Sequence, residues 1–525
     1  MSRLNTSVHL LLFLLIVIIF GCAPLDERPS DIDYPKGQFT LYLNGPDRTS
    51  KDITFDLSAI NLVASDGTAT EVVSSPVTIN SLDVAGRQIL LGESEIPENR
   101  YVKIQLIISQ ATIIKDGRMA RLALPSETVE IPVSIYSSRK QNIPLFIYWN
   151  PDGSVTDTYL FRPVFTAKGK IPELSSLMAY VTNEDSDNIS VINRQTGDVV
   201  ASIMVGKKPR GIALSEGGDR LRVYVVNSGT NDISVIDPTT NKIVNEIPLR
   251  FGRGPEGIAL VRISPEKEFL YVTNYESNSL SIVNAVTLQE TDKVDVGIGP
   301  VAVAADPSVS VLSNARSLSL NDIHELERYR DSFFNIYVAN KNSNTVSILR
   351  MDNISGRKEE VITVDVEWNP IALAVDYIRG KVYVANHGSD KLSIIDILEV
   401  NRGNAAGAVG VINNVGTAVI GIVPDTIFDR VYLLREMPGE VMVIRTPARE
   451  NHSIRSELTP VMGMIPVGRF PRSIAIDPEI RKLYVVNRGS DTITVIDKTT
   501  KQLEQTIPVG RKPYGIAMFS EGLRR

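Results

Sequence analysis

The residues best suited to chemistry in this sequence are basic and aromatic side chains that follow a recurrent turn. The turn reads Gly-x-x-Pro or a close variant and recurs through the second part of the chain, often with Lys or Arg inside it. The residue directly after its Pro is Arg210, Arg472 or Tyr514 in some copies. Guanidinium groups and a phenol hydroxyl suit recognition of a carboxylate or another polar group. The sequence therefore predicts a surface that binds anions, if the fold gathers these turns.

Other kinds of catalytic or metal centre find little support in the residues. The single Cys, Cys22, excludes disulfides and thiolate-cluster metal sites. His324, His387 and His452 have no H-x-x-x-H or H-E-x-x-H spacing. A Gly-x-Ser-x-Gly elbow, a phosphate-binding loop and a dinucleotide fingerprint are also absent from the sequence. We therefore expect no metal, no cofactor and no catalytic residue, with a hydrolase that uses scattered carboxylates left open as an alternative.

A repeated unit of four short apolar segments positions these turns. Its first segment centres on a Tyr, and most copies carry an Asn three residues later. Four strands separated by turn residues are typical of one propeller blade. We expect each Tyr to lie in a half-buried strand and each Asn to bond the backbone of its own turn, so neither set forms a catalytic array. The tyrosines are Tyr180, Tyr224, Tyr271, Tyr337, Tyr383, Tyr432 and Tyr484, and the residues expected to hold the next turn are Asn193, Asp237, Asn284, Asp396 and Asp497.

These segments resemble the YVTN-type β-propeller repeat of bacterial and archaeal surface proteins. The resemblance implies that the small-residue segment is the innermost strand of each blade, followed outward by the Tyr strand. It implies no particular activity, because the same fold hosts binding proteins, lactonases and cofactor-dependent oxidoreductases. The first copy lacks its inner strand, whereas a spare one remains at 515–519. We expect this C-terminal strand to complete the first blade and to close a seven-bladed β-propeller over residues 177–525.

In that arrangement, the residue after each turn Pro lines one mouth of the central channel. Basic and aromatic residues then come from neighbouring blades, and aliphatic residues form the opposite half of the ring. In blade order these positions hold Tyr514, Arg210, Glu256, Val301, Ile371, Ile420 and Arg472. The predicted ligand-binding residues are Arg210, Arg253, Arg472, Arg511, Lys512 and Tyr514, for a ligand that is an acidic glycan, a carboxylate or an acidic loop of an envelope protein.

Two alternatives to this mouth remain. In the first, acidic residues of adjoining turns neutralise the turn cations, which then serve only to keep the surface soluble. The acidic residues are Glu184, Asp185, Asp187 and Asp491. The binding surface lies on the opposite face if the long inserts at 308–335, 401–410 and 446–463 form it. Within the first insert, 321–329 is predicted to form a short helix capped by Asn321.

Residues 37–168 show a different pattern. Apolar residues alternate in 37–43, 101–108 and 129–135, and no segment keeps a helical spacing over three turns. This predicts an N-terminal β-sandwich of about seven strands. The opening strand and the segment 96–104 look like a sandwich domain found in bacterial lipoproteins, and a linker around 168–176 joins this region to the repeats.

The pattern at the N-terminus predicts an export signal. Arg3 precedes an apolar run at 10–20 that, at roughly 1.5 Å per helical residue, is too short to cross a bilayer. Ile19-Phe20-Gly21-Cys22 resembles a bacterial lipobox, with Phe20 departing from its usual residues. The resemblance implies a signal peptide at 1–21, lipidation at Cys22 and a polar tether at 22–36. The alternative is an uncleaved signal anchor.

Composition and pattern together predict an exported, all-β protein anchored to a membrane through lipidated Cys22. The net charge of −6 argues against a dedicated nucleic-acid binder. We expect a monomeric, non-catalytic binding or scaffold protein at the cell surface or periplasmic face. The alternatives are an envelope enzyme, either lactonase-like or a redox propeller, and a nucleic-acid-binding propeller.

Overall fold

The structure, a computed structural model, describes residues 36–73, 75–139, 141–156, 159–168, 177–215, 221–307, 318–425, 427–445, 461–477 and 479–519. Residues Lys36–Arg525 form one compact unit. The predicted signal peptide, Cys22 and nearly all of the predicted tether lie outside the described residues. Among the residues that are described, no helix is long and apolar enough to span a bilayer.

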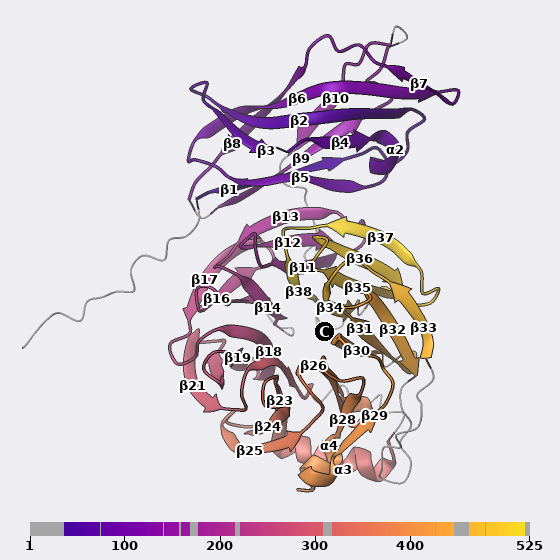
Figure 1. Ribbon diagram of the computed structural model, residues 1–525. Coiled ribbons are helices and arrows are strands. Elements are labelled where there is room, and N and C mark those ends of the chain that lie inside the picture. Colours follow the sequence, from indigo (N-terminus) through magenta and orange to yellow (C-terminus); the bar gives the residue numbers. More distant parts are fainter. Residues whose placement is uncertain are drawn as a thin grey trace, which may run out of the picture. The chain divides into compact units, whose positions relative to one another are not determined.

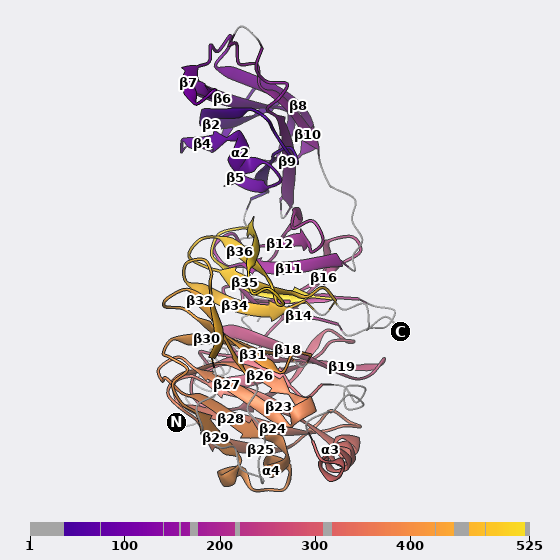
Figure 2. The same ribbon diagram turned by 90° about the vertical axis from the view of Figure 1, so that its right-hand side faces the viewer.

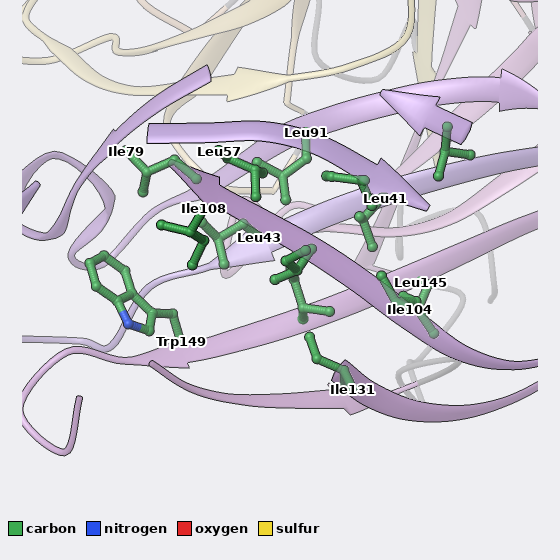
Figure 3. Close-up of a cluster of buried hydrophobic side chains, with 14 of the residues drawn as sticks. Leu41, Leu43, Leu57, Ile79, Leu91, Ile104, Ile108, Ile131, Leu145 and Trp149 are labelled. Atoms are coloured by element: carbon green, nitrogen blue, oxygen red, sulfur yellow. The ribbon is translucent and has the colours of Figure 1, made fainter. Parts of the chain in front are cut away.

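The described part of the N-terminal region holds ten strands in two sheets, rather than the seven or so expected from the sequence. One sheet has the order β10-β9-β1-β5, and β2, β3, β4, β6, β7 and β8 form the other. Leu41, Leu43 and Leu145 from the first sheet meet Leu57 and Ile104 from the second in one buried cluster (Figure 3). The strands are β1 (Gln38–Asn44), β2 (Asp52–Ala64), β3 (Ala69–Val73), β4 (Val77–Asn80), β5 (Gln88–Glu95), β6 (Arg100–Lys115), β7 (Arg118–Arg121), β8 (Thr128–Tyr136), β9 (Asn142–Asn150) and β10 (Val164–Lys168), with a short helix α2 (Ser81–Val84).

Strand β1 is buried on both of its faces, although its sequence alternates. Phe39, Leu41 and Leu43 belong to the cluster between the two N-terminal sheets. Tyr42 stacks on Phe146 at 5.5 Å between ring centroids, within a cluster that also contains residues of the repeats. The second face of β1 therefore packs on the repeats rather than facing solvent.

The repeats form four-stranded antiparallel sheets, consistent with the blades of a β-propeller (Figure 1). In the described part of the chain there are seven, numbered blades 1–7 below. The strands of each blade are given from inside outward. Blade 1 has β38 (Pro513–Met518), β11 (Met178–Asn183), β12 (Asn188–Asn193) and β13 (Val199–Met204). Blade 2 has β14 (Pro209–Leu214), β15 (Val223–Asn227), β16 (Asp232–Asp237) and β17 (Lys242–Pro248), and blade 3 has β18 (Pro255–Ser264), β19 (Lys267–Asn274), β20 (Ser279–Asn284) and β21 (Gln289–Asp295). Blade 4 has β22 (Pro300–Ala305), β23 (Phe333–Asn340), β24 (Thr345–Asp352) and β25 (Lys358–Asp365), and blade 5 has β26 (Pro370–Asp376), β27 (Lys381–Asn386), β28 (Leu392–Asp396) and β29 (Val409–Ile412). Blade 6 has β30 (Val419–Asp425), β31 (Arg430–Arg435), β32 (Glu440–Arg445) and β33 (Val461–Pro466), and blade 7 has β34 (Pro471–Ile476), β35 (Lys482–Asn487), β36 (Thr492–Asp497) and β37 (Leu503–Pro508).

The C-terminal strand pairs with the first blade, as the sequence predicted. Strand β38 runs antiparallel to β11, with Tyr180 opposite Ala517 and Val181 opposite Ile516. The inner strands contact one another in sequence from β14 to β38, and β38 contacts β14 in turn. The two ends of the repeat array are therefore held together by backbone pairing rather than by a covalent bond.

The outer strand of blade 1 differs from its counterparts. Val199–Met204 is buried along its whole length, whereas β17, β21 and β37 are mainly exposed. Strand β9 contacts β13, and Asn142 Nδ2 donates to Ser202 Oγ at 2.5 Å. Gln88 exchanges two hydrogen bonds with the backbone of Val199, at 2.9 and 3.2 Å. The apolar sequence of β13 thus reflects the N-terminal sheet that covers it.

The recurrent Tyr and Asn residues have structural roles. All seven tyrosines are buried. Most repeat asparagines hold their hairpin through side chains: Asn487 Nδ2 donates to Thr492 Oγ1 at 3.2 Å and to Thr494 Oγ1 at 2.8 Å. The expectation of bonding to the turn backbone is confirmed at Asn386, whose Nδ2 donates to Lys391 O at 3.0 Å. It was wrong for the other five, because the hairpin brings the fifth and seventh residues onward to the same face as the Asn. The expectation for the next turn is confirmed, since the side-chain oxygen accepts backbone N–H groups at Asn193, Asp237, Asn284, Asp396 and Asp497.

The insert between β22 and β23 contains a helix that is longer than predicted. Helix α3 (Leu320–Ser332) is capped by Ser319, whose Oγ accepts the N–H of Asp322 at 3.1 Å, so Asn321 is not the cap. Leu326 is buried in a cluster with Leu398 of α4 (Ile397–Asn401). Both helices lie beside blades 4 and 5 (Figures 1 and 2). This described part of the insert extends the core of those blades.

Candidate ligand-binding site at the propeller mouth

The residues after the turn prolines surround one cavity, as the repeat predicted, together with Ile420, which follows Val419 in place of a Pro. The cavity has a volume of about 240 Å³ and lies between the first halves of the inner strands. Its polar side comes from neighbouring blades 7, 1, 2 and 3, and its aliphatic side from blades 4, 5 and 6. The residues at the predicted positions are Arg472, Tyr514, Arg210, Glu256, Val301, Ile371 and Ile420.

Arg210 is held by two carboxylates. Its Nη2 lies 2.7 Å from Glu184 Oε1, and its Nη1 donates to Glu256 Oε1. Burial lowers the pKa of Arg210, but Glu256, Tyr514 and Glu184 outweigh this effect and leave the pKa above its usual value. Arg210 is therefore a structural cation of the cavity wall, and much of its charge is already neutralised by protein groups.

Glu184 is shared between two blades. Arg488 Nη2 lies 2.6 Å from Glu184 Oε2, while Arg210 takes the other oxygen. Burial raises the pKa of Glu184, yet the hydrogen bonds from Arg488 and Arg210 hold it below its usual range. The carboxylate thus stays ionised and is fully used as an acceptor. The sequence identified Glu184 as a neutralising residue but missed Arg488, which lies on a turn outside the Gly-x-x-Pro motif.

Arg472 has a different environment. Its guanidinium stacks over the ring of Tyr514, 4.2 Å from the ring centroid, and its Nη2 donates to the Tyr514 hydroxyl. Tyr514 donates that hydroxyl's proton to Glu256 Oε2 at 2.8 Å, and burial raises the pKa of Tyr514. Within the described residues, no carboxylate lies within ion-pair distance of Arg472. The cavity wall therefore offers one guanidinium whose charge is not matched by a contacting carboxylate.

Three of the predicted binding residues do not line the cavity. Arg253 is exposed on its turn. Lys512 Nζ lies 2.6 Å from Asp185 Oδ2, and Arg511 Nη2 donates to the backbone oxygen of Asp185 at 3.2 Å. These three cations belong to the rim of the mouth, because each precedes the turn Pro, whereas the residue after the Pro turns inward.

Several other features lack the convergence of charge found at the mouth. A larger cavity of about 780 Å³ runs along β8, β9, β13 and the β16–β17 turn, and the charged residues among its described lining are Arg139 and Lys242. His387 Nε2 lies 3.2 Å from Glu436 Oε2 on a part-exposed turn. In the described part of the chain, no group of three or more His, Cys, Asp or Glu side chains is placed to hold a metal ion.

The fold and the central cavity define a β-propeller protein. No family model matches the chain, and no curated protein matches it either. Solved structures with a similar fold include a functionally unknown protein of Desulfotomaculum acetoxidans, with 14% identity, a TM-score of 0.50, and coverage of 65% of this chain and 98% of that one.

Two further structures are similar at lower scores. Hydrazine synthase of Kuenenia stuttgartiensis shares 17% identity over 62% of this chain and 93% of that one, with a TM-score of 0.47. A putative 6-phosphogluconolactonase of Bacteroides uniformis shares 16% identity over 65% of this chain and 99% of that one, with a TM-score of 0.48. These likenesses concern the fold alone. The resemblance to the YVTN-type repeat stays a prediction from the residues.

Proposed function

We propose that this chain is a non-catalytic binding protein of the cell envelope, anchored through lipidated Cys22, whose mouth binds a small polar or anionic ligand. In this proposal a closed seven-bladed propeller of the YVTN type carries the site, and residues 37–168 form a β-sandwich domain packed against it. The sandwich makes the covered outer strand of blade 1 unavailable for pairing with other chains. The protein acts as a monomer without a cofactor.

The observation that carries the binding proposal is the environment of Arg472. Its guanidinium faces a small cavity, lacks a contacting carboxylate among the described residues, and is oriented by the Tyr514 ring and hydroxyl. The opposite wall is aliphatic, and such low-dielectric walls strengthen the attraction of a cation for an incoming anion. A carboxylate with a short apolar body fits both halves of the ring.

A catalytic role has less support from the same geometry. Glu184 and Glu256 are the carboxylates nearest the cavity, and both already accept hydrogen bonds from Arg210. A general base needs a free lone pair directed at the substrate, and neither carboxylate provides an unengaged group. The lactonase-like or redox alternative would show itself as consumption of a ligand that binds at the mouth.

A nucleic-acid ligand fits the mouth poorly. The cavity of about 240 Å³ is small, and acidic residues such as Glu184, Asp185 and Glu256 are interleaved with the cations. A nucleic-acid binder would lose affinity steeply as salt rises, because bound cations are released from the polymer. A small anion at a single guanidinium would show a much weaker salt dependence.

Thermal-shift screening of the chain from residue 23 onward against small carboxylates, uronic acids and phosphates tests the proposal. We expect at least one carboxylate to raise Tm, since binding only to the folded state stabilises it. Arg472→Gln should remove this shift, and Arg253→Gln, which changes an exposed rim cation, should keep it. Binding that survives Arg472→Gln would overturn the proposed site. Acyl labelling of the full-length chain that persists in Cys22→Ser would contradict the lipid anchor.

A further inference from the structure

Large apolar side chains are exposed around the mouth as well as the cations. Trp368 is 67% exposed, Ile298 55%, Phe251 52% and Phe470 50%. Each lies in the turn before an inner strand, the same turn whose Pro precedes a residue of the cavity wall. The rim therefore displays a set of aromatic and aliphatic groups that the propeller core does not use.

The turns present these side chains in a fixed backbone geometry. The N–H of Gly388 donates to Trp368 O at 3.0 Å, and the N–H of Arg488 donates to Phe470 O at 3.1 Å. Phe470 has a φ of 45°, in the left-handed region, and the equivalent residue of every other blade shares this conformation; these residues are Lys208, Gly254, Gly299, Asn369, Ala418 and Lys512. The positive φ therefore belongs to the repeated turn, which holds the side chain at this position in a fixed direction. Half of the Phe470 side chain remains exposed to solvent and is accessible to another molecule.

Cations and aromatic groups alternate on this rim. Arg469 and Phe470 are consecutive exposed residues of one turn, and Phe251 and Arg253 share another. Aromatic residues and Arg are enriched in protein interfaces, and Trp, Tyr and Arg dominate their binding energy. The cavity at the centre of the rim, about 240 Å³, falls below the roughly 300–1,000 Å³ usual for small-molecule pockets. It is better matched to one side chain of a larger partner.

We propose that the mouth face docks a protein segment that carries an acidic side chain between apolar residues. The carboxylate of that side chain enters the cavity and pairs with Arg472, and its apolar neighbours cover Phe470 and Trp368 on the rim. The rim cations complement further acidic residues of the same segment. This inference rests on the proposed function in that Arg472 anchors the anion, and it adds that the anion belongs to a protein.

Selection of a displayed library of random dodecapeptides on the full-length protein in detergent tests this inference. We expect enrichment of sequences with Asp or Glu flanked by apolar residues. Synthetic copies of the enriched peptides should bind the unaltered protein and lose affinity at least tenfold with Phe470→Ala, Trp368→Ala or Arg472→Gln. Ile354→Ala is the matched control, because Ile354 is 71% exposed on a turn at the other end of blade 4.

The outcomes separate this inference from the proposed function. If small carboxylates bind through Arg472 but no acidic-apolar motif is enriched, the protein partner is wrong and the anion site stands. If enriched peptides bind equally well to the Phe470, Trp368 and control variants, the rim is not the docking surface. Binding of acidic glycans that depends on Trp368, without any peptide enrichment, would also overturn the inference.

Discussion

The two ends of the inner strands carry charge in different ways. At the mouth, Arg210 and Arg472 are part-exposed and border a cavity. At the opposite end, four of the described inner strands end in, or are directly followed by, a buried Asp that contacts a charged or polar side chain. These acidic residues are Asp306, Asp376, Asp425 and Asp477, which are at most 2% exposed.

Two of these carboxylates, Asp425 and Asp477, join neighbouring blades at the opposite end. Lys498 of blade 7 lies 2.9 Å from Asp425 of blade 6, and both side chains are buried. Arg194 of blade 1 lies 2.6 Å from Asp477 of blade 7. Removing one partner of a buried ion pair leaves an uncompensated charge in a low-dielectric interior, whereas part-exposed charges are solvated. The comparison indicates that one end fixes the ring and the other end is available for recognition.

The largest effect is expected from Arg194→Ala. Arg194 pairs with Asp477 and with Glu479, and its Nη2 donates to Phe519 O at 3.2 Å, just after the strand that completes blade 1. The substitution leaves the buried Asp477 carboxylate without its cation and should lower the free energy of unfolding by about 3–5 kcal/mol. Denaturant unfolding measures this loss. An effect below about 1 kcal/mol would mean that the buried pair does not hold the ring closed.

The next effect is a pH dependence centred on Asp306. Burial raises the pKa of Asp306 from 3.8 to about 6, against the opposing effects of Arg330 and of hydrogen bonds from Asn335 and Tyr337. Below pH 3.8 both states hold the proton; between 3.8 and 6 the folded state binds it more tightly. Stability from this group is therefore present at low pH and is lost as pH rises through about 6, by roughly 3 kcal/mol at most.

Asp306→Asn should remove that dependence, because an amide does not titrate. Unfolding free energies at pH 4.5, 5.5 and 7 measure this effect: the stability of the unaltered protein relative to Asp306→Asn should increase as pH falls from 7 to 4.5. A difference that is constant over this range would show that Asp306 keeps an ordinary pKa. Asp185→Asn, on an exposed turn, serves as the control.

The sequence could predict the mouth because its information is periodic. The repeated turn Pro placed Arg210, Arg472 and Tyr514 around one cavity, and the unmatched strand at the C-terminus predicted its pairing with β11. The same register locates Glu184 and Glu256 near the mouth. It could not predict that both carboxylates pair with Arg210, because the direction of a side chain depends on packing between blades.

The buried charges of the opposite end were less predictable. Asp477 and Arg194 lie in the last and first blades, so their contact requires the ring to be closed. The apolar sequence of β13 contrasts with the polar residues of β17, β21, β25 and β37, but β29 and β33 are apolar too, so the sequence of β13 alone did not show that another layer covers blade 1. Only the structure identifies the N-terminal sheet as that layer.

The smallest effects on stability are expected at the mouth, where Arg210 and Arg472 can be compared directly. Arg210→Gln removes two charge-assisted contacts, but Glu184 keeps Arg488 and Glu256 keeps Tyr514, so we expect a loss of about 1–2 kcal/mol. Arg472→Gln removes a hydrogen bond to a neutral hydroxyl and the stacking on the Tyr514 ring, and should lower stability by about 1 kcal/mol or less, while abolishing anion binding. Denaturant unfolding and binding measurements on both variants test which Arg stabilises the fold and which binds the anion. If Arg472 proved the more stabilising residue, these two roles would be reversed. We expect Arg210→Gln to lower mainly the stability and Arg472→Gln to lower mainly the affinity for the anion. This pattern would show that protein carboxylates neutralise Arg210, whereas Arg472 is available to a ligand.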